Sequence, residues 1–507
     1  MDVAAALAAH LGELAGLEVY QRSITSDRGA LLFLGREGRE RRLAVMSPEP
    51  DERFDGEQSD VTVERHRLRL RRCPTDASNA AALRKALPCF APRPLGLEPS
   101  IGCGDRLGLA TPGHVRAVRR HSMAPILAQQ SVRELERTGR TPVEVLDAAT
   151  WGALLEGWRN GFGADADHLK TTGDVDRFVD AGFSFFTVDP GDQVDDEADD
   201  ASEAALRDKV AALPWDALDA SESSLGERYL GRRFDLEHEA LELDEETLWR
   251  AAAKYGRAVA HTAALHRHLD SRMGDRPFEL EMSVDETARP TSALDHLFVA
   301  SELERLGVRW VSLAPRFIGD FEKGVDYRGD LVALEDSFAR HAAIARVLGP
   351  YKISLHSGSD KFSVYPIAAR HAGELVHVKT AGTSYLEALR VIARVEPELF
   401  REILAFALAH FDGDRATYHI SGRKDRVPAP GETPDAELRA VLEQDDGRQV
   451  LHVTFGSVLT EKDGDGFRFR DRLLGALQEC ENEHSTALEA HFERHLAPFD
   501  ARGGTDQ

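Results

Sequence analysis

The sequence predicts an α/β protein built on a (β/α)8 TIM-type barrel over residues 90–400. From Phe90 onward, short apolar runs that end in glycine or a polar cluster alternate with longer amphipathic segments, as βα units require. The polar residues fall at the ends of these runs, where barrel active sites are built. The eight runs are RPLGLEPSIG, PILAQQS, GADADHLKTT, FSFFTVDPGD, FELEMSVDET, WVSLAPRFIGD, YKISLHSGSD and LVHVKTAGTS.

Residues 1–89 are expected to form a small α+β segment ahead of the barrel. The first twenty residues, MDVAAALAAHLGELAGLEVY, have no basic region and are interrupted by His10 and Glu13, so they predict an amphipathic helix and not a signal peptide. Alternating segments such as ALLFLG and RRLAVM then predict strands.

Within the barrel region the helical patterns are 143–158, 246–268, 294–306, 331–348 and 385–395. An insertion at about 190–245 separates the fourth and fifth strands on the active face, where a lid or a subunit contact would lie. Its acidic stretch, DQVDDEADDASE, predicts a solvated or disordered segment. Residues 401–507 are expected to form a C-terminal extension packed on the barrel, with helices at Pro397–His410 and near 475–496.

Composition narrows the classes of partner and compartment. The formal net charge of −24 argues against nucleic acid or an anionic membrane as a partner. No apolar run reaches the length of about 18 residues that a membrane span needs. The four cysteines are far apart and form no CxxC pair, which indicates a reducing cytoplasm. A homo-oligomer is left open by these features.

The third run, GADADHLKTT, places a carboxylate beside an imidazole. In a regular strand Asp167 and His168 point to opposite faces. A bulge at the strand end would bring both into one pocket, which suits a histidine that binds a divalent cation and a carboxylate that moves protons.

A catalytic metal commonly has three protein ligands and open positions for substrate and water. His168 and His356 are the best two candidates, since His356 follows an apolar strand in SLHSGSDK. Glu281, mounted on the fifth strand, suits general acid–base work, whereas Asp189 precedes proline in a turn and is a weaker candidate. That leaves Asp320 or Glu322 for the carboxylate ligand, and chemistry alone does not separate them.

The glycine-rich segment IGCGDRLGLATPGH, residues 101–114, predicts an active-site loop in which backbone amides approach a ligand. Asp105 and Arg106 are its polar contributors.

Longer phrases resemble the tagaturonate epimerase (UxaE-type) family of bacterial hexuronate catabolism. They cover roughly 90–390 in order: FAPRPLGLEPSIGCGDRLGLATPGH, GADADHLKT, SLAPRFIGDFEKGVDYRGD, YKISLHSGSDKFSVYP and HVKTAGTSYLEALR. The resemblance implies interconversion of D-tagaturonate and D-fructuronate at carbon 4 with a divalent cation.

The resemblance also implies a proton acceptor immediately before a metal ligand, which matches Asp167 and His168. It implies a downstream proton donor, for which Glu281 is the candidate, and two further ligands, placed at Glu322 and His356.

Carbon 4 lies β to the carbon 2 ketone, so its hydrogen is not acidic and a retro-aldol route is expected, with a cation stabilising the enediolate. Manganese, zinc, cobalt, nickel and iron all suit such ligands. Arg316, Lys361 and Lys379 are candidates for the substrate's remote carboxylate. The alternatives are a metal-dependent aldolase, a ketose epimerase acting on a related sugar or sugar acid, and a sugar-acid binding protein without activity.

Overall fold

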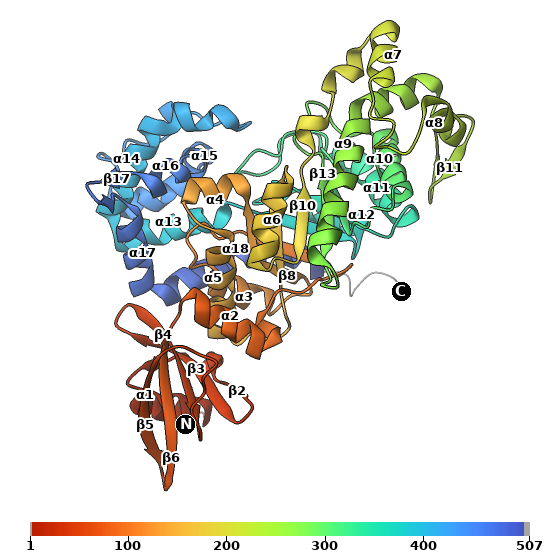
Figure 1. The fold of residues 1–507 in the computed structure, drawn as a ribbon. Helices are drawn as coiled ribbons and strands as arrows, with labels where there is room; N and C mark the ends of the chain where they lie inside the picture. The colour runs from red at the N-terminus through yellow and green to blue at the C-terminus, as the bar shows by residue number, and fades with distance from the viewer. Residues whose placement is uncertain (1–2, 501–507) are drawn as a thin grey trace, which may run out of the picture.

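The structure, a computed structural model, describes residues 3–500. Figure 1 shows a small N-terminal sheet below a central barrel, with a helical C-terminal region on one side and the helices of an insertion on the other. Residues 501–507 of the predicted C-terminal extension lie outside the described residues.

The N-terminal segment is α+β. Helix α1 (Val3–Ala15) packs its Leu11 with Phe33 and Met46 of an antiparallel sheet of order β1-β3-β4-β6-β5, in which β2 also pairs with β3. Its arginine-rich strand β6 alternates leucine inward with arginine outward, so Arg69 pairs with Asp60 on β5. The strands are β1 (Glu18–Val19), β2 (Thr25–Asp27), β3 (Ala30–Glu37), β4 (Glu40–Ser47), β5 (Glu57–Val63) and β6 (His66–Pro74).

The eight predicted runs form the eight strands of a closed parallel barrel, which confirms the predicted fold class. The order around the barrel is β10-β13-β14-β15-β16-β7-β8-β9. In this register Glu281 lies opposite Thr187 on one side and Ser312 on the other. The strands are β7 (Ser100–Cys103), β8 (Ala124–Ser131), β9 (Gly163–Leu169), β10 (Phe185–Val188), β13 (Glu279–Ser283), β14 (Ser312–Ala314), β15 (Lys352–Leu355) and β16 (Val376–Thr380).

Helices cover the barrel from outside, and local sequence fixes where several begin. Thr141, Thr171 and Ser292 each form a capping box that satisfies free amides of the first turn. Gly182 ends α6 in the left-handed conformation, φ +96°, which favours glycine. The helices are α2 (Ala77–Ala86), α3 (Thr111–Val118), α4 (Val132–Thr138), α5 (Pro142–Leu155), α6 (Thr172–Ala181), α9 (Glu245–Met273), α10 (Ala293–Arg305), α11 (Leu331–Val347), α12 (Tyr365–Ala372) and α13 (Thr383–Val395).

The insertion between β10 and α9 holds α7 (Glu203–Ala211), α8 (Glu222–Tyr229), β11 (Arg233–Asp235) and β12 (Ala240–Glu242). Of the two expectations for its acidic stretch, the disordered one is wrong, because residues 191–200 contain two short 3-10 helices and a fully buried Ala198. The solvated one agrees with the structure, since most side chains of residues 192–203 are at least partly exposed. Lys209 pairs with Asp195 at 2.6 Å and Lys254 with Asp199 at 2.7 Å. These lysines lie outside the stretch, so its own composition could not predict them.

The C-terminal region is helical and returns to the barrel. Its last helix, α18, packs against α3, α12 and α13, so it completes the outer layer of helices (Figure 1). The helices are α14 (Pro397–Asp414), α15 (Asp445–Val453), α16 (Phe455–Thr460), α17 (Arg470–Glu479) and α18 (Glu481–Asp500), with a small hairpin of β17 (Lys462–Asp463) and β18 (Gly466–Phe467).

None of the helices between residues 3 and 500 is long and apolar enough to cross a membrane. All four cysteines are free thiols.

Candidate active site

The end of β9 carries the centre of the site. Its pairing with β10 shifts register between Phe186 and Val188, and His168 adopts a left-handed φ of +54°. This irregularity turns Asp167 and His168 toward the same region, with Asp167 Oδ1 3.9 Å from His168 Nε2. The predicted bulge at this strand end is therefore confirmed.

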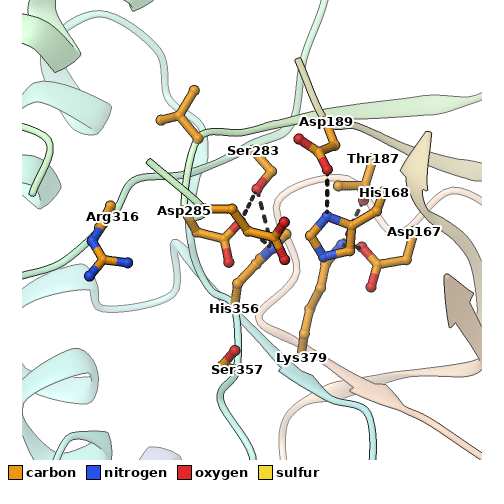
Figure 2. A network of polar contacts seen from close by, with 12 residues as sticks. Asp167, His168, Thr187, Asp189, Ser283, Asp285, Arg316, His356, Ser357 and Lys379 are labelled. Carbon is orange, nitrogen blue, oxygen red and sulfur yellow. Dashed lines mark hydrogen bonds and ion pairs between the residues drawn. The ribbon is translucent and has the colours of Figure 1, made fainter. Parts of the chain in front are cut away.

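Lys379, at the end of β16, lies in the middle of a group of carboxylates. Its ammonium contacts Asp165 and Asp167 at 2.8 Å each and Glu281 at 2.9 Å, and donates to Thr187 Oγ1 at 2.6 Å. Burial opposes the charge, but the three carboxylates outweigh it and raise the pKa of Lys379 above its usual value. Lys379 is thus a cation that links Asp167 to Glu281. Because its donors are used by groups of the protein, the structure does not support its predicted role as a binder of the substrate carboxylate. Figure 2 shows Lys379 beside Asp167 and Thr187.

The carboxylates around this lysine differ in charge state. Burial would raise the pKa of Asp167, but Lys379, His168 and His356 outweigh it and hold the pKa below its usual range. Glu281 behaves likewise, with Lys379 and His356 as the main causes. Burial raises the pKa of Asp165 to about 7 despite Lys379. Asp167 and Glu281 are therefore ionised at neutral pH, while Asp165 is partly protonated.

Two imidazole rings lie next to each other and to these carboxylates. The rings of His168 and His356 have centroids 5.3 Å apart in an edge-on arrangement (Figure 2). His168 Nδ1 lies 3.2 Å from Asp189, and His356 lies 2.6 Å from Glu281 through Nε2 and 3.2 Å from Asp285 through Nδ1.

The charge of both rings is set by their carboxylate neighbours. Burial lowers the pKa of each imidazole, but Asp167 and Asp189 raise the pKa of His168 to about 9. Asp285 and Glu281 likewise raise the pKa of His356 to about 10. Without a metal, both imidazole rings are protonated on both nitrogens and positively charged at neutral pH.

The donor set fits a divalent cation. One ligand atom from each of Asp167, His168 and His356 lies within 4.8 Å of the other two. Imidazole nitrogen and carboxylate oxygen are ligands that divalent transition metals accept, and Asp189 beside His168 is the kind of partner that orients a ligating imidazole.

Glu322 is not in this group, which contradicts its predicted role as a metal ligand. Its Oε2 accepts hydrogen bonds from Ser421 at 2.7 Å and Gln449 at 2.8 Å, both in the C-terminal region. The alternative, Asp320, contacts His419 at 3.1 Å and is also absent from the group. Both carboxylates connect the loop after β14 to the C-terminal region.

Lys361 is also placed differently from its prediction. Its ammonium donates to the carbonyls of Glu322, Val325 and Ser359 at 2.6–2.9 Å and is fully buried. Since all three protons are used, Lys361 holds the loop after β14 and has no donor left for substrate.

The glycine-rich segment has a structural role. Asp105 accepts three backbone amides of its own turn, from Leu107, Gly108 and Ala110. Arg106 pairs with Glu134 at 3.0 Å and stacks on Phe455. The expected ligand contacts of Asp105 and Arg106 are therefore replaced by contacts within the protein.

A pocket of about 240 Å³ opens beside His356. Arg316 lines it, as its prediction as a substrate contact requires, together with Asp285, two residues past the end of β13. Lys323 lines it too, although sequence reasoning missed it. Burial and nearby Arg133 lower the pKa of Lys323. The only sequence signal for Lys323 was its place in the phrase FIGDFEKGVDY.

Comparison with known proteins identifies the family of this chain. The family model for tagaturonate epimerase matches residues 20–499. The tagaturonate/fructuronate epimerase of Thermotoga maritima is 42% identical over 490 residues, covering 96% of this chain and 97% of that protein. Crystal structures of the fructuronate-tagaturonate epimerase of Cohnella laeviribosi, one native and one with a single glycerol, superpose with a TM-score of 0.89 at 36% identity. They cover 97–98% of this chain and 99% of theirs. As the sequence phrases implied, the chain belongs to the tagaturonate epimerase family, a family of isomerases.

Proposed function

We propose that this protein is a divalent-metal-dependent epimerase that interconverts D-tagaturonate and D-fructuronate at carbon 4. The names of the relatives, tagaturonate/fructuronate epimerases, supply the pair of sugars. The observation that carries the proposal is the group formed by Asp167, His168 and His356 at the barrel mouth, with Glu281 joined to Asp167 through Lys379. The free thiols support a reducing cytoplasm as its compartment.

In this proposal His168 and His356 hold the cation and Asp167 lies beside it. When bound, the cation supplies a Lewis acid for the oxygens of the carbon 2 ketone and the carbon 3 hydroxyl. Asp189 orients the ring of His168, and Asp285 and Ser283 contact Nδ1 of His356.

The reaction breaks and remakes the bond between carbons 3 and 4. As the carbon 4 hydroxyl loses its proton, its oxygen forms an aldehyde and the electrons of the carbon 3–carbon 4 bond pass into an enediolate. The aldehyde rotates, carbon 3 adds to its other face, and the new alkoxide takes a proton. No carbon–hydrogen bond breaks at carbon 4.

Asp167 is the group that accepts the hydroxyl proton, because it is ionised and adjacent to both imidazoles. Glu281 is ionised in the resting site, so it returns a proton to the new alkoxide only after the proton accepted by Asp167 has passed to it, and the protons balance over one turnover. Lys379 lies within 2.9 Å of both carboxylates, so it can hold them at fixed separation and balance their charge as the proton moves. Lys379 is thus a positioning residue.

Proton NMR of D-tagaturonate incubated with metal-loaded protein tests the proposal. Signals of D-fructuronate should appear until the two sugars reach equilibrium, and should not appear with chelator-treated protein. Accumulation of a free three-carbon fragment would indicate an aldolase instead.

A further inference from the structure

The pocket beside His356 is lined by more cationic side chains than its carboxylates neutralise. Most of its ionisable groups already have partners: Arg133 with Glu286 at 3.4 Å, His419 with Asp320 at 3.1 Å, and Asp285 with His356 at 3.2 Å. Two further cations line this pocket, Lys323 and Arg316, and neither forms an ion pair with a carboxylate of residues 3–500.

Within residues 3–500 the ammonium of Lys323 makes a single hydrogen bond, to Ser357 Oγ at 2.6 Å, and pairs with no carboxylate. Ser357 directly follows His356, so the Lys323 ammonium lies close to this candidate metal ligand. The loop that carries Lys323 is fixed, because Lys361 binds the carbonyl of Glu322, the residue before it. A cation held rigidly beside a pocket is preorganised for an anion.

Arg316 follows β14 and lines the same pocket. Its Nε is buried and has no partner among the described residues, and its guanidinium makes no ion pair there. Figure 2 shows the guanidinium apart from the hydrogen-bonded network of Asp285, Ser283 and His356. A buried guanidinium nitrogen without a partner costs free energy unless a ligand supplies an acceptor.

We propose that Lys323 and Arg316 form the subsite that binds the carboxylate of a sugar acid, in the same pocket that His356 lines. The inference rests on the proposed function, because it assumes that the ketone end of the sugar is held near His168 and His356. A carboxylate at the far end of the chain then meets both cations, and two charge-assisted contacts fix the orientation of the sugar.

This subsite would distinguish a uronate from the corresponding ketohexose. D-tagatose has the same carbon chain and ketone as D-tagaturonate but carries CH2OH in place of the carboxylate. It would leave Lys323 and Arg316 without an anion, so the wild type should bind it more weakly.

The test is equilibrium binding by calorimetry, with metal-loaded protein and D-tagaturonate or D-tagatose as the probe. Lys323→Met and Arg316→Met should each weaken tagaturonate binding roughly 10- to 100-fold, the scale of one charge-assisted hydrogen bond. Tagatose binding should change by less than about 2-fold on the same scale. Lys323→Arg keeps the charge and should retain most of the affinity. Lys424→Met, a matched change at an exposed lysine paired with Asp412, should alter neither.

Equal weakening for both sugars, unchanged tagaturonate binding in Lys323→Met and Arg316→Met, or a wild type that binds both sugars equally would overturn the subsite. If Lys323→Met does not fold, judged by circular dichroism, Arg316→Met and Lys323→Arg carry the test. The proposed function fails separately: a wild type that shows the charge-dependent binding but converts no tagaturonate keeps the subsite and loses the epimerase. A wild type that converts tagaturonate but binds tagaturonate and tagatose equally keeps the epimerase and loses the subsite.

Discussion

Replacing Asp167 by asparagine separates its two possible roles, proton acceptor and metal ligand. The change keeps the shape of the side chain and removes its charge. The amide oxygen of the new side chain can still accept from Lys379. Gln129 donates to Asp167 at 3.0 Å, and its buried carbonyl oxygen has no partner among residues 3–500. Gln129 can turn this oxygen toward the new amide, so we expect the site to stay packed.

The loss of the base should then appear in turnover. We expect kcat to fall by roughly 10²–10⁴-fold, which corresponds to about 3–5 kcal/mol of transition-state stabilisation. The metal content, measured by inductively coupled plasma mass spectrometry, should stay near that of the wild type, since His168 and His356 remain.

Asp165→Asn is the matched control. Asp165 is on the same strand and binds the same lysine at 2.8 Å, but it is absent from the group of candidate metal-binding atoms. Burial raises the pKa of Asp165 to about 7, so asparagine resembles a form that it already populates. Its kcat should fall far less than that of Asp167→Asn. Loss of the metal in Asp167→Asn would refute the assignment and make Asp167 a ligand.

The remaining predictions concern the metal and the second carboxylate. Chelator-treated protein should be inactive yet fully folded by circular dichroism, because a barrel of this size does not depend on one ion, and activity should return with a divalent transition metal. His168→Ala and His356→Ala should each lower bound metal, and stoichiometric metal in both would place the ligands elsewhere. Glu281→Gln should reduce kcat by roughly 10²–10⁴-fold with metal retained; loss of metal would make Glu281 a ligand and Asp285 the leading donor. The raised pKa values of His168 and His356, about 9 and 10 against 6.5, mean that a cation must displace their protons, so metal affinity should rise with pH up to about 10. Because folding raises both pKa values, the protonated rings stabilise the metal-free protein at low pH. This stability should be lost as the pH rises from about 6.5 to 10, which urea titration at each pH would measure. Deuterium at carbon 4 should be retained through turnover, and its washout would exclude the retro-aldol route.

The barrel could be predicted from sequence because its signals are local. Each strand is a short apolar run and each helix an amphipathic repeat, and parallel strands bring their carboxyl ends together whatever the loops contain. Asp167, His168, Glu281 and His356 follow from that rule alone, since each stands on or just beyond a strand.

The remaining assignments depended on contacts that no local pattern encodes. Glu322 is bound by Ser421 and Gln449, about one hundred residues further along the chain. Lys361 looks like an anion binder until its three carbonyl partners are seen, and Lys379 until its three carboxylates are seen. Lys323 stood beside the favoured Glu322 in the same phrase, but only the folded loop shows which of the two faces the pocket.

The return of α18 to the barrel has a consequence for the order of synthesis. Its His491 contacts Asp360 at 2.8 Å, in the loop that also carries His356, and the backbone amide of Asp360 donates to His495 on the same helix. The ribosome makes this helix after every strand of the barrel, so the loop lacks these two partners when the strands have already been synthesised. A nascent chain stalled before residue 481 can contain every barrel strand and still lack the α18 contacts that hold the loop carrying His356. Enzymatic competence would then be acquired only once this helix has been made, not gradually as the strands appear.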